Sequence, residues 1–159
     1  MNIRITAQTI ARFMIVATIA FASVSCASAP YVQKEKGVLK LVSLINEGGV
    51  SEVEGLTPTP FALDSETLYL ESDVSTFWKN LKAASFEMTD ARFVETEPVG
   101  PDSYKTFADT FDMKNFFEKY TGKDTSIVSL DTRDGRYYVL LERKVQGYPK
   151  VRGLKGPVQ

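Results

Sequence analysis

The sequences TSIVSLDT at residues 125–132 and RYYVLLERKV at residues 136–145 decide the fold class. Both stretches are rich in β-branched, aromatic and aliphatic residues, which favour strands. Asp134-Gly135 lies between them and is typical of tight hairpin turns. Side chains alternate along a strand, so one face of each stretch can meet a core. The pattern therefore predicts a β-hairpin close to the C-terminus.

Three amphipathic helices are predicted ahead of this hairpin. Apolar residues recur at helical spacing within residues 34–46, 74–85 and 113–120. The second and third helices can be overlaid at an offset of 39 residues, which leaves an internal duplication open. The residues expected to begin or end the helices are Gly48, Gly49, Ser72, Asp73, Asp112 and Gly122.

Weaker strand patterns at residues 67–71 and within 86–97 complete the expected fold. We predict an α+β domain over residues 37–145, with three amphipathic helices packed on one face of an antiparallel or mixed sheet and a C-terminal β-hairpin. Proline-containing residues 50–66 and 98–106 are expected to be ordered loops. Residues 146–159 (QGYPKVRGLKGPVQ) carry three glycines, two prolines and three cations, so a basic flexible tail is predicted.

The composition excludes several kinds of enzyme. The 159 residues include no histidine and one cysteine, which removes the usual serine and cysteine triads, zinc sites and internal disulfides. No phosphate-binding loop or Ser-x-x-Lys motif occurs. We therefore expect no metal and no cofactor.

Paired carboxylates are the catalytic chemistry that remains, as in glycoside hydrolysis. Asp64, Glu66, Glu71 and Asp73 flank one predicted strand, close in sequence to Tyr69 and Trp78, whose rings could stack on a sugar. Helix capping by Asp73 and burial of Trp78 explain the same residues without catalysis. A carboxylate-based hydrolase acting on an envelope glycan is thus the alternative function, and a non-catalytic role is favoured.

Charge is distributed unevenly along the chain. Residues 47–102 hold twelve acids against three cations, whereas residues 133–159 hold seven cations against two acids. A basic end could meet anionic lipid headgroups, an acidic polysaccharide or an acidic protein. The basic end could equally fold back onto the acidic part of the same chain. A reading without a partner is favoured, because surface charges usually serve solubility.

The first 25 residues have the three parts of a secretory signal peptide. Arg4 and Arg12 precede an apolar run at residues 13–22 (FMIVATIAFA), which small residues follow. The run is about half the roughly 20 residues that a transmembrane helix needs. We therefore expect residues 1–25 to direct export and to be removed, which leaves 17 basic and 20 acidic residues.

The single cysteine, Cys26, follows the small residues directly. This arrangement resembles the lipobox of bacterial lipoproteins, and the resemblance covers the signal region alone. It implies that Cys26 is lipidated and becomes the mature N-terminus, with residues 26–36 as a tether. Cleavage after residues 20–22 (AFA) is the competing possibility, and it would leave an unpaired thiol in an exported chain. Ala27, which is not aspartate, favours the outer membrane by resemblance to enterobacterial sorting.

These observations predict a lipid-anchored cell-envelope protein with a non-catalytic binding or structural role. The lipid anchor makes the membrane its first partner, and an anionic envelope polymer or a protein is a second candidate; no nucleic-acid partner is expected. The aromatic residues are expected mainly in the core, with an apolar pocket as the alternative. The residues expected to make exposed contacts in the tail are Tyr148, Lys150, Arg152 and Lys155.

Overall fold

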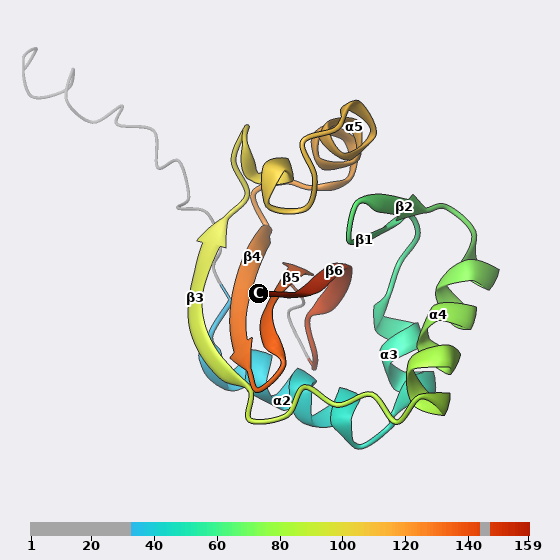
Figure 1. Cartoon of the computed structure of the whole chain (residues 1–159). Helices are drawn as coiled ribbons and strands as arrows, with labels where there is room; N and C mark the ends of the chain where they lie inside the picture. The colour runs from blue at the N-terminus through green and yellow to red at the C-terminus, as the bar shows by residue number, and fades with distance from the viewer. Residues whose placement is uncertain (1–32, 144–146) are drawn as a thin grey trace, which may run out of the picture.

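A computed structural model describes residues 33–143 and 147–159, and it confirms an α+β fold (Figure 1). Residues 1–25 and Cys26 lie outside these ranges. The helices are α2 (Glu35–Asn46), α3 (Val50–Leu56), α4 (Glu71–Ala83) and α5 (Phe111–Tyr120), with a short 3-10 helix η1 (Ser103–Thr106). The strands are β1 (Phe61–Leu63), β2 (Glu66–Leu68), β3 (Arg92–Pro98), β4 (Thr125–Thr132), β5 (Gly135–Glu142) and β6 (Lys150–Val158).

The strands form one mixed sheet in the order β2-β1-β6-β5-β4-β3. Strands β1 and β6 are parallel, and the other neighbours are antiparallel. Strands β4 and β5 pair along their whole length, with Thr132 opposite Gly135. The connection between them is therefore Arg133-Asp134, and Gly135 takes a φ of 134°. This glycine has no room for a side chain, because an added Cβ would lie 2.9 Å from the Val158 backbone oxygen.

The C-terminal residues form a strand, so the predicted flexible tail over residues 146–159 is wrong. Strand β6 lies between β5 and β1 and pairs with both. The predicted hairpin is consequently not the last element of the fold. Glycines in β6 caused the error, because Gly153 and Gly156 are read as signs of flexibility when the neighbouring chains are unknown. An added Cβ at Gly156 would lie 2.7 Å from the Arg136 backbone oxygen.

The two segments predicted as loops contain regular structure. Residues 50–66 include α3 and β1, and residues 98–106 include η1. Helix α3 has only seven residues, too few to show helical periodicity, yet it buries Val53 and Leu56. Strand β1 has three residues and depends on pairing with β2 and β6.

The first predicted helix ends where the sequence indicates. Gly48 adopts a φ of 71°, and its N–H donates to Ile45 O while Gly49 N–H donates to Leu44 O. This is the Schellman arrangement that glycine favours.

The predicted N-terminal caps of the other two helices are wrong, whereas Gly122 directly follows the C-cap of α5, as predicted. Leu70 occupies the N-cap of α4, which leaves Ser72 and Asp73 inside its first turn. At α5, Thr110 is the N-cap, and its side-chain oxygen accepts a hydrogen bond from Met113 N at 3.3 Å.

Helices cover both faces of the sheet, which corrects the prediction of three helices on one face. One core joins α2, α3 and α4 to the face that carries Val128, Val139 and Val151. A second core joins α5 to the opposite face through Ile127 and Leu140. Figure 1 shows the same division, with α5 apart from the other three helices. Within the described ranges, no helix combines the length and apolar character of a membrane span.

Candidate functional site

The carboxylates proposed for glycan hydrolysis are dispersed, and one of them is structural. Asp64 lies at the turn between β1 and β2 with a φ of 50°. Its Oδ1 accepts a hydrogen bond from Gly156 N at 3.0 Å. Asp64 therefore ties the β1–β2 turn to β6, which gives this carboxylate a structural role.

The other three acids lie on exposed surface. Glu66 is in β2, whereas Glu71 and Asp73 are in the first turn of α4. Acidic side chains at this end of a helix interact favourably with its dipole. Among the described residues, no group of three or more Asp, Glu or Cys side chains could hold a metal ion.

Tyr69 and Trp78 do not form a common sugar platform. The Tyr69 side chain is 61% exposed, whereas Trp78 is 2% exposed within the main core. The Trp78 indole N–H donates to Thr57 Oγ1 at 3.1 Å, and Thr57 Oγ1 donates to Val53 O at 2.7 Å. Trp78 thus connects α4 to the end of α3, which is a structural role.

Arg152 and Lys150, two of the cations expected in a tail, are paired with Glu142 on the neighbouring strand. Arg152 Nε lies 2.7 Å from Glu142 Oε2, and Lys150 Nζ lies 3.4 Å from Oε1. Burial raises the pKa of Glu142, but hydrogen bonds and charges from Arg152 and Lys150 outweigh it, so this pKa lies below its usual value. The Arg152 side chain is only 16% exposed. These two cations therefore join β5 to β6.

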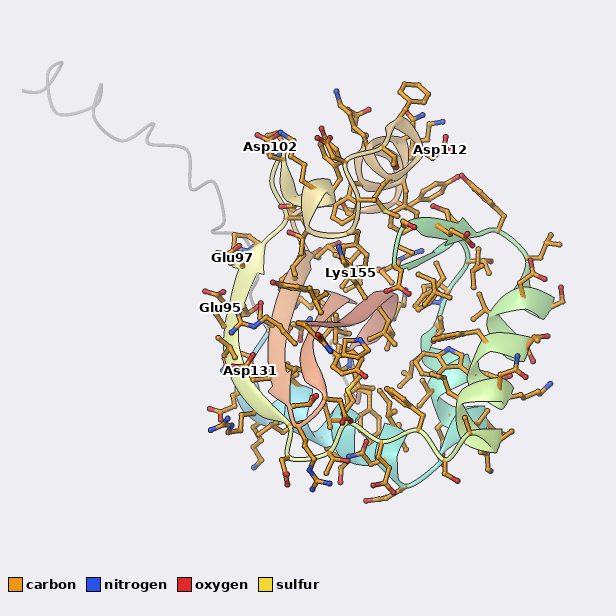
Figure 2. All side chains as sticks on the ribbon, viewed as in Figure 1. Glu95, Glu97, Asp102, Asp112, Asp131 and Lys155 are labelled. Carbon is orange, nitrogen blue, oxygen red and sulfur yellow. The ribbon has the colours of Figure 1, made fainter. Side chains whose placement is uncertain are left out.

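Lys155 lies on the opposite face of the sheet from the main core and has its own partners. Its Nζ donates to Thr106 O at 2.8 Å and to Phe107 O at 2.7 Å, so it caps the carboxyl end of η1. Lys155 also lines a shallow depression of about 360 Å³ together with Glu95 and Glu97. Figure 2 shows these two acids along β3 at the edge of the sheet and Lys155 nearer its middle.

Tyr148, the fourth residue expected in the tail, lies beside α2. The Lys40 ammonium stands 4.9 Å from the centroid of its ring, a cation–π contact. Lys36 is one turn earlier on the same side of α2, and both lysines are exposed, as is Lys34 before the helix. We name Lys34, Lys36, Lys40 and Tyr148 the α2 basic surface. The i, i+4 spacing of Lys36 and Lys40 is visible in the sequence, but the proximity of Lys40 to Tyr148 follows from the fold alone.

The pocket beside Trp78 is small. It measures about 190 Å³ and lies between the ends of α2 and α4 and the start of α3, where Trp78, Leu81 and Phe86 contribute to its wall. Pockets that hold drug-sized ligands usually measure 300–1,000 Å³. Asn46 contributes polar atoms at its edge, but its amide is bonded to Met88 N and Met88 O. Most of the described aromatic side chains are either buried in the two cores or packed, partly buried, against them.

Comparison with known proteins does not place this chain in a family. No protein-family model matches it, and no curated protein is significantly similar to it. The function is therefore argued from its own residues.

Proposed function

We propose that this protein is a lipid-anchored component of the bacterial cell envelope with a non-catalytic binding or structural role. The observation that carries the proposal is the order of segments: a basic start, an apolar run, small residues and then Cys26. Gln33, the first described residue, follows seven positions later and is already buried. A folded domain thus begins within a short reach of the proposed lipid.

The two cores support a domain that stands outside the bilayer and is held by its N-terminus. Acyl chains contribute about 0.8 kcal/mol per buried methylene, so a cysteine that carries more than one chain stays at the membrane without a spanning helix. Ala27 after Cys26 supports the outer membrane as the destination, by the enterobacterial sorting pattern.

The contacts of the acidic residues support a role other than catalysis. Asp64 is engaged at the β1–β2 turn, and Glu142 is engaged between β5 and β6. Arg136 and Asp131 also pair, with Nε 2.7 Å from Oδ1. These three acids thus hold neighbouring parts of the fold together, and no specific observation favours the glycan hydrolase.

Metabolic labelling tests the anchor directly. Bacteria expressing the full chain are grown with radioactive palmitate, and the protein is isolated and compared with Cys26→Ser. We expect label in the natural chain and none in the variant, which should accumulate as an unprocessed precursor. Ser28→Ala is the matched control and should be labelled normally. An unlabelled natural chain, or a Cys26→Ser chain that is processed and released, would indicate plain secretion.

Membrane fractionation tests the destination. The natural chain is expected in the outer-membrane fraction, and Ala27→Asp is expected to shift it to the inner membrane in an enterobacterial host. Equal distribution of both chains would remove the argument from Ala27 while leaving the lipid itself untouched.

A further inference from the structure

The α2 basic surface lies beside the N-terminal end of the described domain. Gln33 is 5% exposed and directly precedes Lys34. Seven residues in an extended chain span at most about 25 Å. Because Cys26 stands seven positions before Gln33, a lipid on Cys26 would keep the start of α2 within that distance of the bilayer surface.

Helix α2 turns its apolar side inward and its lysines outward. Val38, Leu41, Val42 and Leu44 are buried in the main core. Lys36 and Lys40 occupy the exposed side, and the Lys40 ammonium is held over the Tyr148 ring. The apolar side is already used by the fold, so this helix would meet a membrane through charge and not through insertion.

Few carboxylates oppose these lysines. Glu35 lies beside them in the first turn of α2, and Glu47 follows the far end of the helix, where it accepts a hydrogen bond from Ser43. Glu142, near the start of β6, already binds Arg152 and Lys150. The excess of acids lies in residues 47–102, which include α3, β1, β2, α4 and β3. Strand β3 contacts α2, and its Glu95 and Glu97 line the depression that Lys155 also lines. Residues 34–47 themselves hold three lysines against two acids, so the described segment nearest the proposed anchor carries a net positive charge.

We propose that the α2 basic surface binds anionic phospholipid headgroups and sets the orientation of the domain on the membrane. This inference rests on the proposed lipid anchor, which supplies proximity. Lysines near an anionic membrane attract it over roughly a Debye length, about 8 Å at physiological ionic strength. Tyr148 adds an amphipathic ring of the kind that suits the interface.

Vesicle binding without the lipid isolates this contact. The chain starting at residue 26 and carrying Cys26→Ser is mixed with phosphatidylcholine vesicles, with or without phosphatidylglycerol, and binding is measured by flotation. We expect binding only with phosphatidylglycerol, and we expect it to weaken as salt rises. Each lysine near the surface contributes about fivefold to partitioning. The double variant Lys36→Gln/Lys40→Gln should therefore bind about 25-fold more weakly.

A matched control separates the surface from net charge. Lys79→Gln/Lys119→Gln removes the same charge from exposed positions on α4 and α5 and should bind as the unsubstituted chain does. Lys34→Gln/Lys36→Gln leaves the Lys40–Tyr148 contact intact and should also bind about 25-fold more weakly. The signal of Trp78, the single tryptophan, checks that each variant is folded.

Three outcomes would overturn the inference: equal binding to vesicles with and without phosphatidylglycerol, equal loss in the α2 and control variants, or retention on a soluble anionic polysaccharide with no binding to vesicles. The anchor itself is tested separately by palmitate labelling. A protein that is labelled with palmitate but does not bind phosphatidylglycerol vesicles would contradict only the proposed role of the α2 basic surface. A protein that is not labelled would contradict the proposed lipid anchor.

Discussion

Substitution of Gly153 by alanine tests whether the C-terminal residues are a central strand of the sheet. Gly153 lies in β6 opposite Leu140 of β5 and Ala62 of β1. An added Cβ would stand 2.9 Å from the Ala62 backbone oxygen, 3.0 Å from Ala62 Cβ and 3.1 Å from Phe107 Cε1. Neither the Ala62 backbone nor the buried Phe107 ring can shift easily, so the extra methyl group should overpack the site.

The expected loss of stability follows from two opposing effects. Overpacking a well-packed core typically costs 1–3 kcal/mol, and about 2 kcal/mol suits three close contacts. Alanine also reduces the freedom of the unfolded chain, which offsets roughly 0.5 kcal/mol. The net loss of about 1.5 kcal/mol should lower the urea midpoint by about 1 M, since m is about 1–3 kcal/mol/M for domains of this size.

Urea unfolding followed by Trp78 fluorescence measures this change, because Trp78 is buried in the core. Gly37→Ala is the matched control. Gly37 lies within α2, and an added Cβ there would meet no atom within 4 Å. This control should raise stability by about 0.5–1 kcal/mol, since alanine favours helix. If Gly153→Ala left the midpoint unchanged, β6 could not be packed against Ala62 and Phe107.

Two further outcomes follow from the same strand. Deleting residues 150–159 should abolish cooperative unfolding, because β1 and β5 would each lose one of two neighbours and the pair β2-β1 would be cut off from β5-β4-β3; a truncated chain with a normal urea transition would contradict the sheet order. Glu142→Gln should destabilise the protein by about 1–2 kcal/mol at pH 7, because the charged bonds to Arg152 and Lys150 are lost. The folded protein holds the pKa of Glu142 below its usual value of 4.5, so this stabilisation is present above pH 4.5 and is lost as the pH falls through the folded value. Unfolding midpoints of the two proteins should therefore converge in acid, and a constant difference would show that the carboxylate charge is not involved.

Elements with local periodicity could be predicted from the sequence, and elements held by distant partners could not. The stripe in residues 34–46 and the β-rich residues 125–132 correspond closely to α2 and β4. Strand β1, in contrast, has three residues, and its place in the sheet depends on β6 from the other end of the chain. No local pattern carries that information.

Glycine explains the largest error in a physical way. A segment with Gly153 and Gly156 reads as flexible because glycine lowers strand propensity and permits many conformations. In the folded sheet both positions are crowded, with backbone oxygens less than 3 Å from any added Cβ. The same composition therefore signals close packing once the neighbouring strands are known.

The α2 basic surface could not be predicted from the sequence for a related reason. The sequence assigned the basic C-terminal residues to one exposed surface, but the fold distributes them by function. Arg152 and Lys150 bind Glu142, and Lys155 binds the end of η1, so their charges stabilise the domain. Of the four residues expected in the tail, only Tyr148 lies beside α2, where its ring contacts Lys40 from a distant part of the chain. Among the described residues, Lys34, Lys36 and Lys40 are the exposed cations nearest in the chain to the proposed anchor, which is why the orientation of the domain is tested through α2 and not through its C-terminus.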